Sequence, residues 1–415
     1  MDKSVMKKGL ALFALGCAGG TIFIIPYIRY VFYDKLINVM QITNAELGSL
    51  LIGFTVAAII LLFFGGAITD RFRSAKVMIQ LSLFGTTVLT VLFAFTLNYY
   101  AALAIWIGFA FTTSFVFWPA LMKAISRVGT PEKMGSMYGL YYAINGMSGA
   151  VFNAAAVYVA AQIADPHDSL LWAMVVIAGS TFFAMIMMHF FYSDDVGEVA
   201  EVKPEDRFSW KDFGVVLKNP YTWLFGLSGF CCYTAYSSNS YFTPYLTAVQ
   251  GVQPEASEVL AIIRTYIFMF LSLVGGLIAD RLLKSTAKYL AIIFGAMVLL
   301  YIGLYVLPLD SQTAPLYTFI PAALTMSMYG IRYSLLREMP IKPEYLGTTI
   351  GVAAMIGYSV DLFTPTMLGS WLDKWGNAGY DAIFVYLAVV TLLGLVVVTF
   401  IFKKSKADKR RMNAA

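Results

Sequence analysis

The sequence is poor in charged residues, cysteine and histidine, and each shortage excludes a class of protein. Only 13% of its 415 residues are charged, whereas soluble globular proteins carry about 25%. Cys17, Cys231 and Cys232 lie in apolar segments without disulfide or metal-site spacing, and two histidines are too few for a haem or metal centre. A phosphate-binding loop and a Gly-x-Ser-x-Gly nucleophile turn are both missing. A soluble enzyme is therefore excluded, and no catalytic activity, metal or cofactor is expected.

What the sequence has instead is long apolar runs. Hydrophobic residues make up 59% of the chain, and the mean hydropathy is +0.73. Because a helix needs about 20 apolar residues to cross a bilayer, these runs predict an all-α membrane protein with twelve transmembrane helices. The first run is too long for a secretory signal. The predicted spans are residues 8–33, 45–68, 77–98, 100–126, 135–163, 169–191, 220–247, 256–279, 288–308, 315–336, 346–371 and 381–402.

The basic residues give the spans a direction. If the N-terminus is cytoplasmic, most of the 29 Lys and Arg residues fall on the inner side, and only Lys35 and Lys374 fall in outer loops. The positive-inside rule therefore predicts that both termini are cytoplasmic. The net charge of +5 then reflects topology rather than nucleic-acid binding. The short loops and short tail favour a bacterial inner membrane, with an intracellular eukaryotic membrane as the alternative, and we expect a monomer.

A polar stretch divides the spans into two groups of six. We predict an N-terminal six-helix bundle over residues 1–191, a cytoplasmic linker over 192–219, a C-terminal bundle over 220–402 and a basic tail over 403–415. The last part of the linker alternates apolar and charged residues at helical spacing, which is typical of a helix on the membrane surface.

The two groups of spans repeat one another. GGAITDRF at 65–72 recurs as GGLIADRL at 275–282, and PEKMGSMYG at 131–139 recurs as PEYLGTTIG at 343–351. Two matches at nearly one offset, at equivalent places in the two halves, indicate an internal repeat of the kind from which many transporters are built.

These motifs resemble those of the major facilitator superfamily, whose signature is a G-x-x-x-D-R stretch after the second span with a weaker copy after the eighth. The chain departs from the signature at Arg73 and Leu283, where the family usually has glycine. The resemblance implies two pseudo-symmetric bundles that rock about a central cavity. It also implies a cytoplasmic gate, for which we take Gly66, Asp70, Arg71, Gly276, Asp280 and Arg281.

Ionisable residues within spans are rare and usually functional. Arg264 and Asp361 both lie about 15 Å from a span end at 1.5 Å per residue, so both are expected near the midplane. Arg264 is predicted to bind an anionic group, or else to pair structurally with Asp361; Asp361 is predicted to carry a proton, or else to form a static ion pair. Arg29 is a further candidate for binding. Lys123 and Arg332 lie close enough to the inner interface to snorkel there, or else they line the cavity.

Polar and aromatic residues recur at helical spacing on several spans, which favours a cavity wall over lipid contact. Pro244 is expected to break the seventh span. Together with Arg264 and Arg29, the candidate substrate-binding residues are Tyr27, Tyr142, Asn145, Tyr233, Tyr236, Ser237, Ser240, Tyr241 and Tyr358.

Basic residues outnumber acidic ones within the spans, so we predict a secondary transporter of a small organic anion of carboxylate, phosphate or sulfonate type, working by alternating access and coupled to protons through Asp361. Two alternatives stay open. One is exchange of anions through Arg264 without protons. The other is efflux of amphipathic compounds, for which 20 methionines and 16% aromatic residues would form an adaptable cavity.

Overall fold

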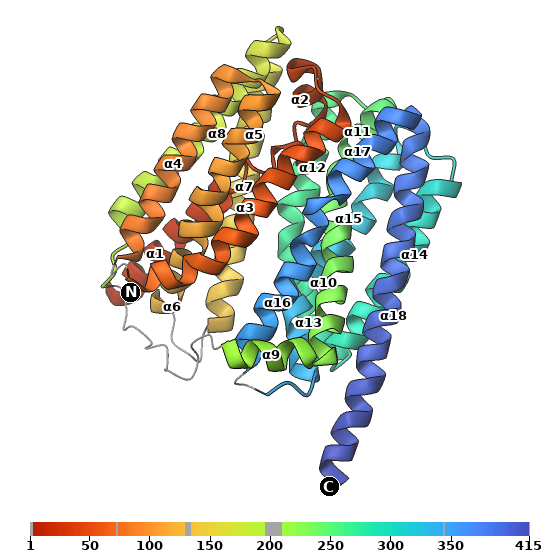
Figure 1. Ribbon diagram of the computed structural model, residues 1–415. Helices are drawn as coiled ribbons and strands as arrows, with labels where there is room; N and C mark the ends of the chain where they lie inside the picture. Colours follow the sequence, from red (N-terminus) through yellow and green to blue (C-terminus); the bar gives the residue numbers. More distant parts are fainter. Residues whose placement is uncertain (1–2, 72–73, 129–133, 196–209, 343–344, 415) are drawn as a thin grey trace. The chain divides into compact units, whose positions relative to one another are not determined.

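The computed structural model describes residues 3–71, 74–128, 134–195, 210–342 and 345–414 (Figure 1). These residues form helices joined by short turns, and no strand occurs among them. Each predicted span overlaps at least one helix. By length and apolar composition alone, 8 of the described helical stretches qualify as membrane spans. The all-α membrane class predicted from the sequence is confirmed.

The chain packs as two compact units, which are described separately. Residues 252–267, predicted to belong with the C-terminal half, pack with the first unit. The division falls at η6 (Ile267–Phe270), a 3-10 segment that interrupts the predicted eighth span. Unit 1 is Met1–Ala200 with Val252–Ile267, and unit 2 is Glu201–Gly251 with Phe268–Ala415.

Unit 1 has its core where α1, α4, α6, α7 and α8 meet. Polar caps set the starts of several helices because a side-chain oxygen accepts from an otherwise unpaired backbone N–H. Ser74 accepts from Val77 at the start of α4, and Asn98 caps α5 in the same way. The helices are α1 (Lys3–Ile22), η1 (Ile28–Tyr30), α2 (Tyr33–Met40), α3 (Asn44–Arg71), α4 (Ala75–Thr96), α5 (Tyr99–Ala110), η2 (Phe111–Phe117), α6 (Trp118–Val128), α7 (Met134–Ala161), α8 (Pro166–Phe191) and α12 (Pro254–Thr265).

Unit 2 is built around α10, which packs against α16 and α18, while α14 runs along α18 (Figure 1). Asn219 caps α10 with Pro220 as its first residue, and Ser285 caps α14. The helices are α9 (Trp210–Lys218), α10 (Pro220–Ser238), η5 (Asn239–Tyr241), α11 (Phe242–Ala248), α13 (Leu271–Leu277), η7 (Ile278–Leu282), α14 (Thr286–Val306), α15 (Thr313–Ile331), η8 (Arg332–Glu338), α16 (Leu346–Tyr358), η10 (Ser359–Leu362), α17 (Thr364–Trp375), η11 (Gly376–Ala378) and α18 (Gly379–Ala414).

Proline explains two helix breaks, of which the one beside Pro244 was expected and the one beside Pro26 was not. The first helix ends at Ile22 rather than near residue 33, because Pro26 has no N–H to donate to the Ile22 carbonyl. Trp106 donates to the Pro26 carbonyl at 3.2 Å and holds the resulting turn. In the seventh span the break is η5, one turn before Pro244, since Pro244 likewise cannot donate to the carbonyl of residue 240.

Candidate functional site

The five ionisable side chains predicted within the spans divide between the units. In unit 1, Arg29 in η1 and Arg264 in α12 are buried, and Lys123 is partly exposed. In unit 2, Asp361 in η10 is buried, and Arg332 is partly exposed. Because Arg264 and Asp361 belong to different units, an ion pair between them stays a prediction.

Asp361 is held by the polar face predicted on the seventh span. Its carboxylate accepts a hydrogen bond from the Tyr233 hydroxyl at 2.6 Å and from the Ser237 hydroxyl at 2.9 Å. One turn later, Tyr241 donates to the Pro365 carbonyl at 2.6 Å. The side chain of Asp361 is 2% exposed and lies in the 3-10 break between α16 and α17. Hydroxyl donors stabilise the charged form of a carboxylate in such a place.

Arg332 begins η8 and is surrounded by tyrosines. Its guanidinium carbon lies 3.7 Å from the centre of the Tyr329 ring and 4.7 Å from that of Tyr333. Nη1 donates to the Tyr329 carbonyl at 2.8 Å, and Nη2 donates to the Tyr358 hydroxyl at 3.2 Å. No ion pair among the described residues includes Arg332. Its charge is therefore held by ring faces and hydroxyls rather than by a carboxylate.

The rings connect Arg332 to Asp361. The Tyr358 ring meets the Tyr233 ring edge-on at a centroid distance of 4.9 Å. Since Tyr358 accepts from Arg332 and Tyr233 donates to Asp361, two tyrosines separate the cation from the carboxylate. Because the two rings are in contact, a movement of either tyrosine would change the surroundings of both charged groups.

A small pocket, with a cavity volume of about 20 Å³, lies beside this chain of contacts, within unit 2. Two predicted site residues, Tyr233 and Tyr358, line it, and Arg332 lines it too. Of the other predicted residues on the seventh span, Tyr236 stacks on Tyr329 at 4.3 Å, and Ser240 in η5 donates to the Ser237 carbonyl near the end of α10. The rest of the lining is Phe225, Gly229, Tyr333, Ala353, Ala354 and Gly357.

The predicted site residues of unit 1 lie in η1 and the turn before it, in α7 and in α12. Arg29 is 3% exposed, and its guanidinium lies 5.6 Å from the Tyr33 ring centre. Tyr27 is half-buried and its ring packs on Phe54. Asn145 in α7 donates to the Tyr141 hydroxyl at 3.1 Å. Tyr142, also in α7, is exposed.

Arg264, in α12, is among the largest fully buried side chains of the described chain, with 1% exposure. Its helix packs against α7. Two residues further on, the Tyr266 ring covers Gly149 so closely that a methyl group there would overlap it.

One ion pair joins α2 to α12. Lys35 lies 3.0 Å and 3.1 Å from the two carboxylate oxygens of Glu258, and the two side chains are 17% and 5% exposed. From the sequence, Lys35 was expected in an outer loop, and Glu258 had no predicted role. A buried carboxylate in an apolar span, the same signal that identified Asp361, was available for Glu258 as well.

The predicted gate is described only in part. The surroundings of Gly66 and the side chains of Asp70 and Arg71 lie outside the described part of the structure. Asp280 and Arg281 are exposed on the π-helical segment η7. A methyl group on Gly276 would make an ordinary contact, 3.5 Å from Ile331. The tight approach is at the preceding residue, Gly275, where a methyl would lie 2.6 Å from the Ser327 carbonyl oxygen.

Near these motifs, an acidic side chain caps the next helix in both units. In unit 1, Asp194 accepts from Ser74 at 2.5 Å and from the Ala75 N–H at 3.0 Å, and pairs with Arg127 at 2.7 Å. In unit 2, Glu338 accepts from Ser285 at 2.9 Å and from the N–H groups of residues 286 and 287. The acids come from non-equivalent positions, so the sequence repeat does not reveal them.

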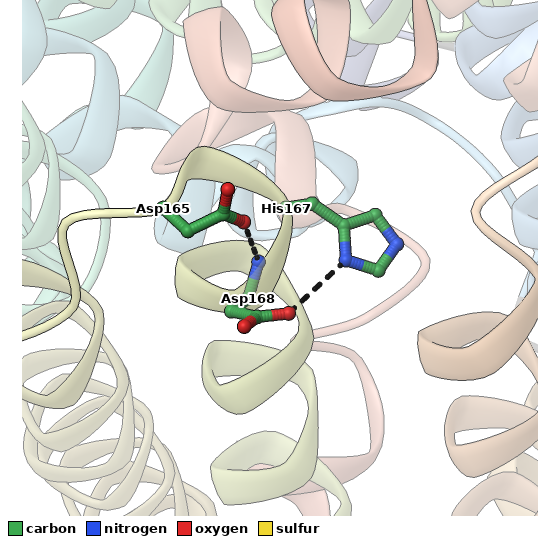
Figure 2. Close-up of side chains that lie close together, drawn as sticks. All are labelled: Asp165, His167 and Asp168. Carbon is green, nitrogen blue, oxygen red and sulfur yellow. Dashed lines mark hydrogen bonds and ion pairs between the residues drawn. The ribbon is translucent and has the colours of Figure 1, made fainter.

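Figure 2 shows an exposed group of Asp165, His167 and Asp168 at the start of α8. The side-chain nitrogen and oxygen atoms that could bind a metal ion lie within 4.8 Å of one another. Helix capping accounts for this arrangement, because Asp165 accepts from the Asp168 N–H at 2.9 Å. His167 lies 3.3 Å from Asp168.

The chain is similar to known membrane proteins over nearly its whole length. Residues 9–365 match the family model of the Major Facilitator Superfamily. Inner membrane protein YihN of Escherichia coli (strain K12) is 27% identical over 99% of both chains. Inner membrane protein YqcE of the same organism is also 27% identical, over 96% of this chain and 95% of that protein.

Solved structures show the same fold. A bacterial homologue of the human lysosomal transporter Spinster, in an inward-facing and unoccupied conformation, superposes with a TM-score of 0.74 at 16% identity, covering 98% of both chains. A D-xylose–proton symporter gives 0.68 at 14% identity, covering 97% of this chain and 98% of that one. The predicted arrangement of twelve helices in two bundles is thereby confirmed.

Proposed function

The chain belongs to the Major Facilitator Superfamily and is a multi-pass membrane protein and secondary transporter rather than an enzyme, and we propose that its cargo is a small organic anion of carboxylate, phosphate or sulfonate type. The observation that carries this proposal is the pocket of unit 2, where a guanidinium without a described ion pair faces a space lined otherwise by rings and small residues. A positive charge held within the helices favours an anion and repels a cation.

Two of the other buried charged residues are arginines and support the same sign. Arg29 and Arg264 are 3% and 1% exposed in unit 1. An arginine presents a planar fork that suits carboxylate, phosphate and sulfonate oxygens. We propose that Arg264 is a second contact of the transported anion.

Proton coupling through Asp361 is the second part of the proposal. Asp361 is buried, held by Tyr233 and Ser237, and separated from Arg332 by Tyr233 and Tyr358. An anion that binds Arg332 and displaces Tyr358 would also move Tyr233 and so alter its hydrogen bond to the Asp361 carboxylate. Binding of the anion would thereby be coupled to protonation of Asp361. Exchange of two anions without protons is the alternative, and it requires that Asp361 keep one protonation state throughout.

The proposed location is a bacterial inner membrane with both termini in the cytoplasm. The distribution of Lys and Arg supports this orientation. Two relatives from Escherichia coli carry the name inner membrane protein.

A thermal-shift screen of the purified protein tests the charge of the cargo. Carboxylates, phosphorylated compounds, sulfonates and lipophilic cations such as tetraphenylphosphonium are compared, because a ligand that binds the native state raises its Tm. We expect stabilisation by one anion class, and less of it in Arg264→Ala. Stabilisation by cations alone, unchanged in that variant, would place the protein among transporters of amphipathic compounds.

A further inference from the structure

An apolar groove runs between α14 and α18 of unit 2, which pack along each other (Figure 1). Each helix contributes four residues at intervals of three, one and three, a spacing that forms one stripe of a helix. The stripe of α14 runs from Val298 to Tyr305, and that of α18 runs from Val385 to Leu392. The cavity volume is about 240 Å³, which exceeds the roughly 150 Å³ of an apolar cavity that binds benzene.

Buried residues form the floor of the groove, and exposed residues form its walls. Tyr301 and Ala388 are buried and lie at the floor. Ile302, Tyr305 and Val389 are exposed and form the walls. The groove therefore opens to the surface of the unit. Because both helices are long and apolar enough to span a membrane, the surface there faces the hydrocarbon of the bilayer.

A close contact between the helices ends the groove toward the middle of the span. One turn before Val298, the Phe294 ring lies on Gly394 of α18, where a methyl carbon would be 2.6 Å from the ring. In the other direction the groove reaches Tyr305, next to the end of α14 at Val306. At 1.5 Å per residue the groove extends about 10 Å along α14. One leaflet contributes about 15 Å of hydrocarbon, so the groove follows most of one leaflet.

Unit 1 has a hydrogen bond at the equivalent place. By order along the chain, α4 and α8 are the third and sixth predicted spans, as α14 and α18 are the ninth and twelfth. Thirteen residues after the capping serine stand Thr87 in α4 and Val298 in α14. The Thr87 hydroxyl lies 2.7 Å from that of Thr181 in α8. The repeated architecture therefore does not by itself require an apolar groove, which is a property of the side chains in unit 2.

The shape and chemistry of the groove favour an alkyl chain as its occupant. Water is a poor filling, since a buried water needs two to four polar partners. An empty groove would forfeit the dispersion contacts of its walls. A second transmembrane helix approaches closely only where small residues lie at the surface, whereas the small residue here, Ala388, lies at the floor between bulky walls. A single alkyl chain is thin enough to pass between those walls and reach it.

We propose that this groove binds one acyl chain of a membrane phospholipid, which lies along α14 in the leaflet at the Val306 end and contacts Ala388 at the floor. In the orientation proposed above, this is the outer leaflet. The inference adds a lipid site to the transporter and is independent of the cargo and its charge.

The test uses a phospholipid that carries a photoreactive diazirine in the middle of one acyl chain, reconstituted with the full chain in proteoliposomes free of detergent. After illumination, mass spectrometry locates the labelled peptides. Ala388→Phe fills the groove. Val396→Phe is the matched control, because Val396 is an exposed apolar residue of the same helix, α18, outside the groove. Tyr305→Ala removes one wall without adding a bulky group.

We expect the label to concentrate on residues 298–305 and 385–392 in the unaltered protein and in Val396→Phe. In Ala388→Phe the labelling of these segments should fall about tenfold or more, which is one decade in Kd. Tyr305→Ala should also lower it, and carries the test if Ala388→Phe fails to fold. Added phospholipid should raise the Tm of the delipidated protein, and should raise that of Ala388→Phe less.

Three results would overturn the inference. A label spread evenly over the lipid-facing helices would show only transient contact with bulk lipid. Labelling of the groove that is the same in the unaltered protein, Ala388→Phe and Tyr305→Ala would place the bound chain elsewhere. Light scattering of the protein in nanodiscs gives its oligomeric state, and a dimer that Ala388→Phe dissociates would identify a second copy of the chain as the occupant.

Discussion

Replacing Glu258 by glutamine should destabilise the protein, because it leaves the Lys35 ammonium group without its counter-ion. The pair joins α2 to α12, with Nζ 3.0 Å and 3.1 Å from the two carboxylate oxygens. Glutamine has nearly the same size as glutamate, so packing is preserved and only the charge is lost.

The magnitude follows from the distance and the burial. At 3.0 Å and an effective dielectric constant of about 20, two unit charges attract by about 5.5 kcal/mol. Part of this attraction offsets the removal of both groups from water. Removing one partner of a fully buried pair costs about 3–5 kcal/mol. Because Lys35 keeps 17% exposure, we expect Glu258→Gln to lower the free energy of unfolding by about 2–3 kcal/mol.

The assay is a double-mutant cycle with Lys35→Met, followed by unfolding in mixed detergent micelles. The double variant should lose little more than either single variant, giving a coupling energy above about 1 kcal/mol. Lys404→Met on α18 is the matched control: Lys404 pairs with Asp408 at 3.2 Å but is 32% exposed, and such pairs contribute only about 0.3–0.5 kcal/mol. Additive losses in the cycle would refute the ion pair as a stabilising contact.

Further outcomes follow from the packing and the caps. Gly275→Ala should lower the Tm, because its methyl group would overlap a carbonyl oxygen, whereas Gly276→Ala should leave the Tm nearly unchanged. Asp194→Asn weakens the cap of α4 and leaves Arg127 without a counter-ion, so we expect a loss of about 2–4 kcal/mol in unfolding titrations. Burial raises the pKa of Tyr192 from 10.0 to about 12. Its contribution to stability is therefore complete below pH 10 and falls as the pH rises toward 12, and Tyr192→Phe should reduce that fall.

The sequence alone singled out the residues that hold Asp361, but as substrate contacts rather than as its hydrogen-bond partners. A carboxylate in an apolar span is costly enough to stand out, and the spacing of Tyr233, Ser237 and Tyr241 placed them on one helix face, which the structure brings against Asp361 and Pro365. Helical periodicity works here because α10 is regular as far as Ser238.

The role of Arg332 was harder to predict. Its distance of five residues from Arg337 suggested the inner interface, but Arg332 begins a 3-10 segment, whose tighter winding changes the face on which each side chain lies. The tyrosines around it come from α15 and α16 as well, and sequence spacing cannot show contacts between distant segments. For the same reason, the depth argument that matched Arg264 with Asp361 assumed straight helices, whereas both spans are interrupted by 3-10 turns at those residues or just after them.

Transport by the reconstituted protein tests the central claim most directly. Proteoliposomes are given the anion selected by the binding screen, and counterflow at equal pH is compared with accumulation driven by a pH gradient. Asp361→Asn should retain counterflow and lose accumulation, while Asp381→Asn, which alters an exposed carboxylate at the start of α18, should retain both. Full accumulation by Asp361→Asn would contradict proton coupling through Asp361.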